Sequence, residues 1–210
     1  MSGLIRLNCL QHLRKQFLFA HLQSVGKNMS TMSSENLVWI DLEMTGLDIN
    51  RDRILEIACI VTDNELNVVA KGPNLVLYQP DSVLEEMNDW CKSMHKKTGL
   101  IDAVKASTNT LQHAEAETLD FVKKYCPEKK CPLAGNSIYM DRLFINKYMP
   151  QLNEYLHYRV VDVSTMKELC KRWNAEVYSN APPKKLVHRS LEDIEESIKE
   201  LRYYKEMFLK

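Results

Sequence analysis

The sequence lacks any long hydrophobic run. No apolar stretch among its 210 residues approaches the roughly 20 residues that a transmembrane helix needs. We therefore expect a protein that does not cross a membrane. Hydrophobic residues still make up 45% of the chain, which is enough for one core, and the length fits one domain with a tail.

Paired cysteines are missing as well. The six cysteines form no C-x-x-C pair and show no spacing typical of a disulfide framework. Cys126 and Cys131 stand five positions apart, but no histidine lies near them to complete a zinc site. We expect all six thiols to be reduced, as is usual for proteins of an intracellular compartment.

The body of the chain has no surplus of basic residues. Four of the 28 basic residues and none of the 28 acids lie in residues 1–34, so residues 35–210 carry a net charge of −4. Proteins that track along nucleic acid normally show a basic face, because binding phosphates supplies much of their affinity. Any nucleic acid bound here should be short or held locally.

The first 34 residues contain no acid at all. Basic residues are interspersed with apolar ones, and Ser, Thr and Asn accumulate toward the end of the segment. Apolar residues recur at steps of three and four, which is helical spacing: Leu4, Leu7, Leu10, Leu13 and Phe17. This pattern predicts a mitochondrial transit peptide over residues 1–34, with a disordered tail as the alternative. A start at Met29 or Met32 would give a cytoplasmic or nuclear form.

Hydrophobic periodicity predicts an α/β fold over residues 35–210, a mixed sheet flanked by helices. Strands are expected at 37–43, 53–63, 66–79 with an interruption near Gly72-Pro73, 132–137 and 158–163. Helices are expected at 82–88 with Ser82 as cap, 98–106, 110–125, 137–148, 164–173 and 190–208. A polar loop is expected over 174–189, and paired lysines such as Lys184-Lys185 are interpreted as solvated.

Two carboxylates end the first predicted strand, in "LVWIDLEMTGLD" (37–48). Asp41 and Glu43 are two positions apart, so on a strand they face the same side. Carboxylates held together repel each other unless a cation lies between them, and Mg²⁺ prefers oxygen ligands. The alternative is that both acids have left the core for a solvated turn that includes Asp48 and Asp52.

Two later segments carry further candidates. The segment "AGNSIYMDR" (134–142) places Asp141 near the start of a helix, where a carboxylate also compensates the helix dipole. The segment "HRSLEDI" (188–194) places His188 in a loop and Asp193 at the start of the last helix. Ser190 and Asp193 together also resemble a capping box. Each segment alone is compatible with an ordinary structural role.

In this order, the candidates resemble the signature of the DEDD-type 3′→5′ exonucleases, in the branch that uses a histidine. The signature has D-x-E on the first strand, an aspartate downstream and H-x4-D near the end. The matching residues are Asp41, Glu43, Asp141, His188 and Asp193. The resemblance covers residues 37–208 and implies an RNase H-like mixed sheet of about five strands flanked by helices in a single domain.

The resemblance also implies a mechanism. The four acids would hold two divalent cations, Mg²⁺ or Mn²⁺, and such a pair clamps both oxygens of an in-line displacement at phosphorus. His188 would take the proton from the attacking water, a role that suits histidine near neutral pH. The expected activity is metal-dependent 3′→5′ exoribonucleolysis that releases 5′-mononucleotides.

Substrate length is a second implication, because the long matching segments are most similar to family members that act on very short RNA, chiefly dinucleotides. There, a leucine wedges against the terminal bases and a tryptophan stacks on them, and Leu47 and Trp90 match these residues. The alternatives are a turn hydrophobe for Leu47 and core packing for Trp90.

Three more residues match positions that enclose the 5′ phosphate of a dinucleotide. Ser137, Arg159 and Ser164 would bind it, and an arginine fork suits a phosphate. His95 and Tyr158 match residues contributed by the partner subunit of a homodimer. Two other readings stay open: an exonuclease acting on longer single-stranded RNA or DNA, and a binding module of the same fold without catalysis.

Overall fold

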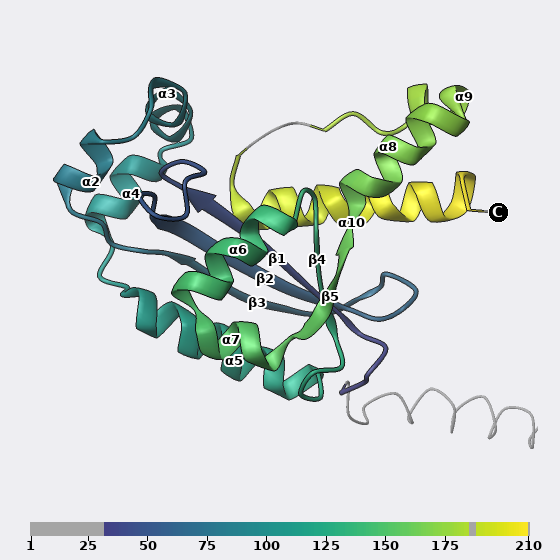
Figure 1. Cartoon of the computed structure of the whole chain (residues 1–210), viewed down its shortest axis with the longest axis horizontal. Coiled ribbons are helices and arrows are strands. Elements are labelled where there is room, and N and C mark those ends of the chain that lie inside the picture. Colours follow the sequence, from purple (N-terminus) through teal and green to yellow (C-terminus); the bar gives the residue numbers. More distant parts are fainter. Residues whose placement is uncertain (1–31, 185–187, 210) are drawn as a thin grey trace, which may run out of the picture. The chain divides into compact units, whose positions relative to one another are not determined.

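A five-stranded mixed sheet organises the chain from Met32 onward (Figure 1). The computed structural model describes residues 32–184 and 188–209, so most of the predicted transit peptide lies outside the described residues. The strands are β1 (Leu37–Met44), β2 (Ile54–Thr62), β3 (Val68–Val76), β4 (Pro132–Gly135) and β5 (His157–Asp162), in the order β3-β2-β1-β4-β5. The first three pair antiparallel, whereas β4 runs parallel to both β1 and β5. The predicted RNase H-like sheet is confirmed.

Helices cover both faces of this sheet. They are α2 (Asp81–Glu85), α3 (Asp89–Lys97), α4 (Leu100–Ala106), α5 (Leu111–Tyr125), α6 (Tyr139–Tyr148), α7 (Pro150–Tyr155), α8 (Val163–Trp173), α9 (Ala175–Ser179) and α10 (Ser190–Met207). None of the described helices combines the length and hydrophobicity of a membrane-spanning segment.

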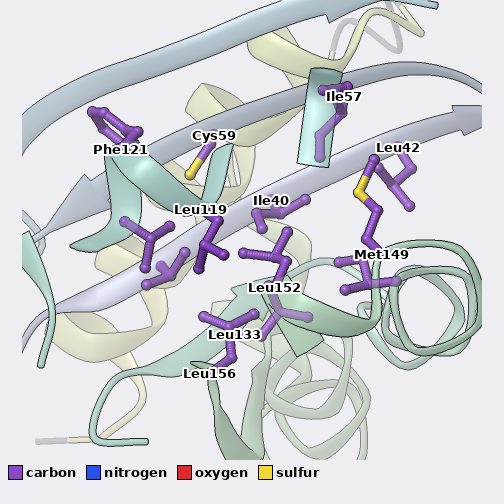
Figure 2. Close-up of a cluster of buried hydrophobic side chains, with 14 of the residues drawn as sticks. Ile40, Leu42, Ile57, Cys59, Leu119, Phe121, Leu133, Met149, Leu152 and Leu156 are labelled. Atoms are coloured by element: carbon purple, nitrogen blue, oxygen red, sulfur yellow. The ribbon is translucent and has the colours of Figure 1, made fainter. Parts of the chain in front are cut away.

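Alternation along β1 divides the core into two layers. Val38, Ile40 and Leu42 belong to a cluster with the apolar residues of α5, α6 and α7, part of which Figure 2 shows. Trp39 belongs instead to a cluster with α8 and α10. Because residues i and i+2 of a strand share a face, Asp41 continues the side of Trp39, toward α10.

The topology gathers three chain segments at one edge of the sheet. β1 and β4 are parallel, so their carboxyl ends lie at the same edge. Asp41 and Glu43 lie near the end of β1 at this edge, and the short link from β4 into α6 begins there. The helix α10 lies against β1 and β2 (Figure 1).

The structure corrects several expected boundaries. β3 continues through Gly72-Pro73, where a register shift opposite Ala58 and Ile60 accommodates the proline in an edge strand. Ser82 lies inside α2, whose cap position is Pro80. Three short helices were not predicted, namely α3, α7 and α9, and α9 lies in the stretch expected as loop.

Candidate active site

The four predicted acids and the histidine meet at the sheet edge. Asp141, in the first turn of α6, accepts a hydrogen bond at its Oδ1 from the backbone N–H of Leu42 at 2.9 Å, which brings it beside the acids of β1. Ligand atoms of Glu43, His188 and Asp193 all lie within 4.8 Å of one another. Together with Asp41, these residues line one cavity of about 630 Å³. The alternative in which the β1 acids have left the sheet is wrong, because both belong to the strand.

Crowding and burial raise the pKa values of the carboxyl groups. Burial, followed by the charges of Asp141, Glu43 and Asp193, holds the pKa of Asp41 well above its usual range. Burial and the charge of Asp193 raise the pKa of Glu43 to about 8. Burial raises the pKa of Asp141 to about 7, although the hydrogen bond from Leu42 opposes the shift.

This donor set fits a divalent metal. Carboxylates held this close ionise together only beside a cation, and a group of oxygen donors is what hard divalent ions prefer. The pKa of Asp193 is also raised, by burial, while the neighbouring His188 opposes that shift. Asp41, Glu43, Asp141 and Asp193 are the residues that would hold the metal.

The turn after β1 presents Leu47 to the cavity. The Thr45 hydroxyl donates to Asp52 Oδ1 at 2.8 Å, and the Asp48 N–H donates to Asp52 Oδ2 at 2.8 Å. Gly46 packs directly on this carboxylate, because a Cβ there would lie 2.5 Å from Oδ2. Leu47 lines the cavity and is 65% exposed, so its side chain remains available for contact with a ligand.

Trp90 lies beside the histidine. Its ring is 60% exposed, lines the cavity and meets the ring of His188 edge-on, with the centroids 5.5 Å apart. The core-packing alternative for Trp90 is therefore wrong. An exposed indole in the same cavity as Leu47 can stack on nucleobases of any sequence.

Two of the expected phosphate-binding residues meet at the ends of β4 and β5. The hydroxyl oxygens of Ser137 and Ser164 are 2.9 Å apart. The Ser137 N–H donates to Ser164 Oγ at 2.7 Å and to Asp162 Oδ1 at 2.9 Å. These bonds hold Ser137 in the left-handed region, with φ of 56°, which residues other than glycine seldom adopt.

Arg159 and Tyr158 lie on the edge strand β5 and are not among the residues that line the cavity. Tyr158 is 72% exposed, and the Arg159 guanidinium lies over its ring, 5.0 Å from the centroid. The ring of His157 also stacks on the ring of Tyr158, with the ring centroids 4.5 Å apart. Tyr158 and Arg159 are both exposed in the single chain, so the structure does not bring either of them to the cavity.

Known proteins match this chain over most of its length. An exonuclease family model, RNase_T, matches residues 38–201. The mitochondrial oligoribonuclease of Bos taurus is 53% identical over 94% of this chain and 84% of its own length, and that of Homo sapiens is 56% identical over 84% and 75%. The oligoribonuclease of Ralstonia nicotianae is 52% identical over 89% and 84%.

The chain belongs to the oligoribonuclease family. It is a nuclease that hydrolyses phosphodiester bonds, and its acidic cluster in this fold indicates the use of a divalent metal. The mitochondrial relatives support a mitochondrial location.

Solved structures show the same fold at low identity. The zinc-bound exonuclease I of E. coli, in a complex with single-stranded DNA, has a TM-score of 0.65 and 15% identity over 85% of this chain. Exonuclease I of Methylocaldum szegediense has a TM-score of 0.62 and 20% identity over 83% of this chain. The chain spans 42% and 41% of those two proteins, so the likeness concerns their nuclease fold alone.

The structure corrects the expected place of His95. It was expected to come from a partner subunit, but it is 1% exposed and lines the cavity of its own chain. Its Nε2 lies 2.9 Å from the carbonyl oxygen of Met44, which can only accept, so Nε2 carries the hydrogen. Its Nδ1 then faces Glu43, 3.8 Å from Oε2.

Two ion pairs next to the site were not predicted from the sequence. Lys184, interpreted as solvated, is largely buried and lies 2.7 Å from Oε2 of the buried Glu200. Arg189 binds Glu56, a fully buried residue of β2. A glutamate inside the otherwise apolar segment "ILEIACIVT" was the signal for the second pair, because a charge is seldom buried without a partner.

Proposed function

We propose that this protein is a 3′→5′ exoribonuclease that degrades very short RNA, chiefly dinucleotides, to 5′-mononucleotides. One observation carries the proposal: four carboxylates and His188 line a single cavity together with the exposed side chains of Leu47 and Trp90. A cavity of about 630 Å³ suits a compact ligand better than a long strand. The names of the relatives support short RNA as the substrate class.

The acids would hold two divalent cations, Mg²⁺ or Mn²⁺. Such ions, when bound, polarise the scissile phosphate and stabilise the charge that develops on its oxygens. The convergence of Asp41, Glu43, Asp141 and Asp193, each with a raised pKa, supports this assignment.

The protein's own residues would orient the substrate and move the proton. His188 accepts the proton of the attacking water, and its imidazole is placed beside Glu43 and Asp193 for this role. Leu47 separates the two terminal bases, while Trp90 stacks on one of them. His95 closes the cavity behind Glu43 and leaves Nδ1 as an acceptor.

Recognition of the 5′ phosphate would limit the length of the substrate. The paired hydroxyls of Ser137 and Ser164 offer donors at the carboxyl ends of β4 and β5. Arg159 would complete the phosphate site with its planar fork. A closed site for one short substrate is also consistent with the net charge of −4 in residues 35–210, since few phosphates need neutralising.

In a homodimer, the exposed Tyr158 would contact the substrate of the partner subunit. Tyr158 and Val160 are exposed on β5, an edge strand that offers unpaired backbone groups. Tyr139 and Leu143 of α6 are exposed as well, and Arg142 of that helix donates to the carbonyl of His157, which ties the two elements together. We propose that a second copy covers this face and that each Tyr158 serves the partner's substrate.

Residues 1–34 would act as the mitochondrial transit peptide, with residues 35–210 as the exonuclease domain, and a start at Met29 or Met32 would yield a cytoplasmic or nuclear form. The acid-free composition and the helical apolar stripe support the signal. Fusing residues 1–34 to a fluorescent reporter tests it. A reporter that stays in the cytosol would refute the assignment.

Turnover against substrate length is the test of the activity. Purified protein is given RNAs of two and of seven nucleotides, with Mg²⁺, with Mn²⁺ and with EDTA. We expect kcat/KM to be higher for the dinucleotide, the product to be 5′-mononucleotide, and EDTA to abolish turnover. Preference for the longer RNA would refute the dinucleotide assignment, and full activity in EDTA would refute the metal assignment.

A further inference from the structure

Arg189 joins three parts of the active site. Its guanidinium binds Glu56 on β2, with Nη2 2.7 Å from Oε1 and Nε 3.0 Å from Oε2. Its backbone N–H donates to Oδ2 of Asp193 at 3.0 Å. It directly follows His188 in the chain. One residue thus links the sheet, an acid of the cluster and the segment that carries the histidine.

Glu56 is the buried carboxylate to which Arg189 binds. It is fully buried, and on β2 it stands directly opposite Glu43 of β1, so both side chains lie on the face toward α10. Its Oε2 also accepts from the backbone N–H of Ser190 at 3.2 Å, at the first residue of α10. The fork of Arg189 and the start of the helix therefore both attach to one carboxylate.

The backbone at His188 is strained. Its φ of 54° lies in the left-handed region, which is unfavourable for a residue with a side chain and persists only where the surroundings impose it. The imidazole ring of His188 contacts the ring of Trp90. The backbone of His188 continues directly into Arg189, which is bound to Glu56. The direction of the imidazole thus depends on where Arg189 is held.

We propose that the Glu56–Arg189 ion pair positions His188 and Asp193 for hydrolysis. The inference rests on the proposed function, because it assigns a role within the same site. An arginine is needed, since its planar guanidinium meets both carboxylate oxygens at once, whereas a lysine offers a single point of charge. Neither Glu56 nor Arg189 touches substrate in this scheme, so both are positioning residues.

A purely structural pair would behave differently from a positioning pair. Replacing a buried ion pair by apolar residues is often neutral or stabilising. The double variant Glu56→Leu/Arg189→Leu should therefore be about as stable as the wild type, but it should not hold His188 and Asp193 in the same positions. Arg189→Lys keeps the charge but loses the fork. Glu195→Ala is the matched control, because Glu195 of α10 pairs with Lys71 of β3 on the surface, away from the cavity.

The experiment measures kcat and KM on a diribonucleotide, calorimetric Mn²⁺ affinity without substrate, and melting temperature. For both Arg189 variants we expect kcat to fall about 10²-fold, because a small misplacement of a reacting group has that effect. KM should change far less, and Mn²⁺ should bind at least roughly tenfold more weakly. The double variant should melt close to wild type, and Glu195→Ala should keep wild-type kcat.

A folded double variant and a folded Arg189→Lys with wild-type kcat and Mn²⁺ affinity would overturn the inference. If the double variant does not fold, Arg189→Lys decides alone. Failure of the proposed function looks different: there the wild type itself does not hydrolyse the dinucleotide or does not bind Mn²⁺.

Discussion

Removing divalent metal should make the stability of this protein fall as the pH rises from 6.5 to 8. Glu43 contributes to this fall, because burial, followed by the charge of Asp193, raises its pKa from 4.5 to about 8 in the folded protein. In this window the folded protein keeps a proton that the unfolded chain has released. Unfolding therefore releases a proton and becomes more favourable as the pH increases.

The size of the effect follows from the same values. A tenfold change in proton affinity is worth about 1.4 kcal/mol, so between pH 6.5 and 8 the free energy of unfolding should fall by about 2 kcal/mol from Glu43 alone. For a domain of this size, that lowers the melting temperature by about 4–8 °C. The window begins at pH 6.5 because the lowered pKa of the buried His95 acts in the opposite direction below that value.

The assay is thermal unfolding in EDTA and in Mn²⁺ at several pH values in this window. A bound divalent ion favours the ionised carboxylates, so it should remove the slope and add about 2.7 kcal/mol at a concentration 100 times its Kd. Glu43→Gln, which cannot titrate, should show a flatter slope in EDTA than the wild type. A wild-type melting temperature in EDTA that stays level or rises from pH 6.5 to 8 would refute the reasoning.

Three further outcomes are expected. Asp141→Asn keeps an acceptor for the Leu42 N–H but removes a charge, so kcat should fall by about 10³-fold while melting stays near wild type; unchanged hydrolysis would remove Asp141 from the metal site. Trp90→Ala should raise KM for dinucleotides by roughly tenfold, since stacking on a base is worth about 1–3 kcal/mol, and an unchanged KM would mean that the indole does not contact substrate. Tyr158→Ala should lower kcat/KM without changing the mass of the proposed dimer, measured by light scattering; wild-type kinetics would show that this exposed ring does not serve the substrate.

The convergence of the four acids and His188 could be predicted from the sequence because their order along the chain matches a family signature. Asp41 and Glu43 share a face through the two-residue period of a strand, and the order of the later acids and His188 completes a signature. The ends of β1, β2, α5, α8 and α10 were also predictable to within one or two residues, since their hydrophobic periodicity extends over many positions.

Contacts between distant segments could not be predicted in this way. Glu56 and Arg189 are 133 positions apart, and neither segment specifies the other. His95 was assigned to the wrong subunit because its residue type gives no indication of which cavity it enters. Short helices are predicted unevenly, because a periodic pattern over one to three turns is weak. The 7-residue α4 was expected, whereas α3, α7 and α9, with 9, 6 and 5 residues, were not.

The free energy that holds the acids together must come from outside the site, because the carboxylates repel one another and lose hydration on burial. α10 illustrates the source. Asp193 lies in its first turn, while Ile194, Ile198, Leu201 and Tyr204 are buried against Trp39, Ala58 and Ile60 of the sheet. Burying each large apolar side chain contributes roughly 1.5–3 kcal/mol, which offsets the repulsion at the end of the helix. The apolar stripe thus fixes α10 against the sheet whether or not a cation is bound, while Asp193 at the start of the same helix supplies the charge.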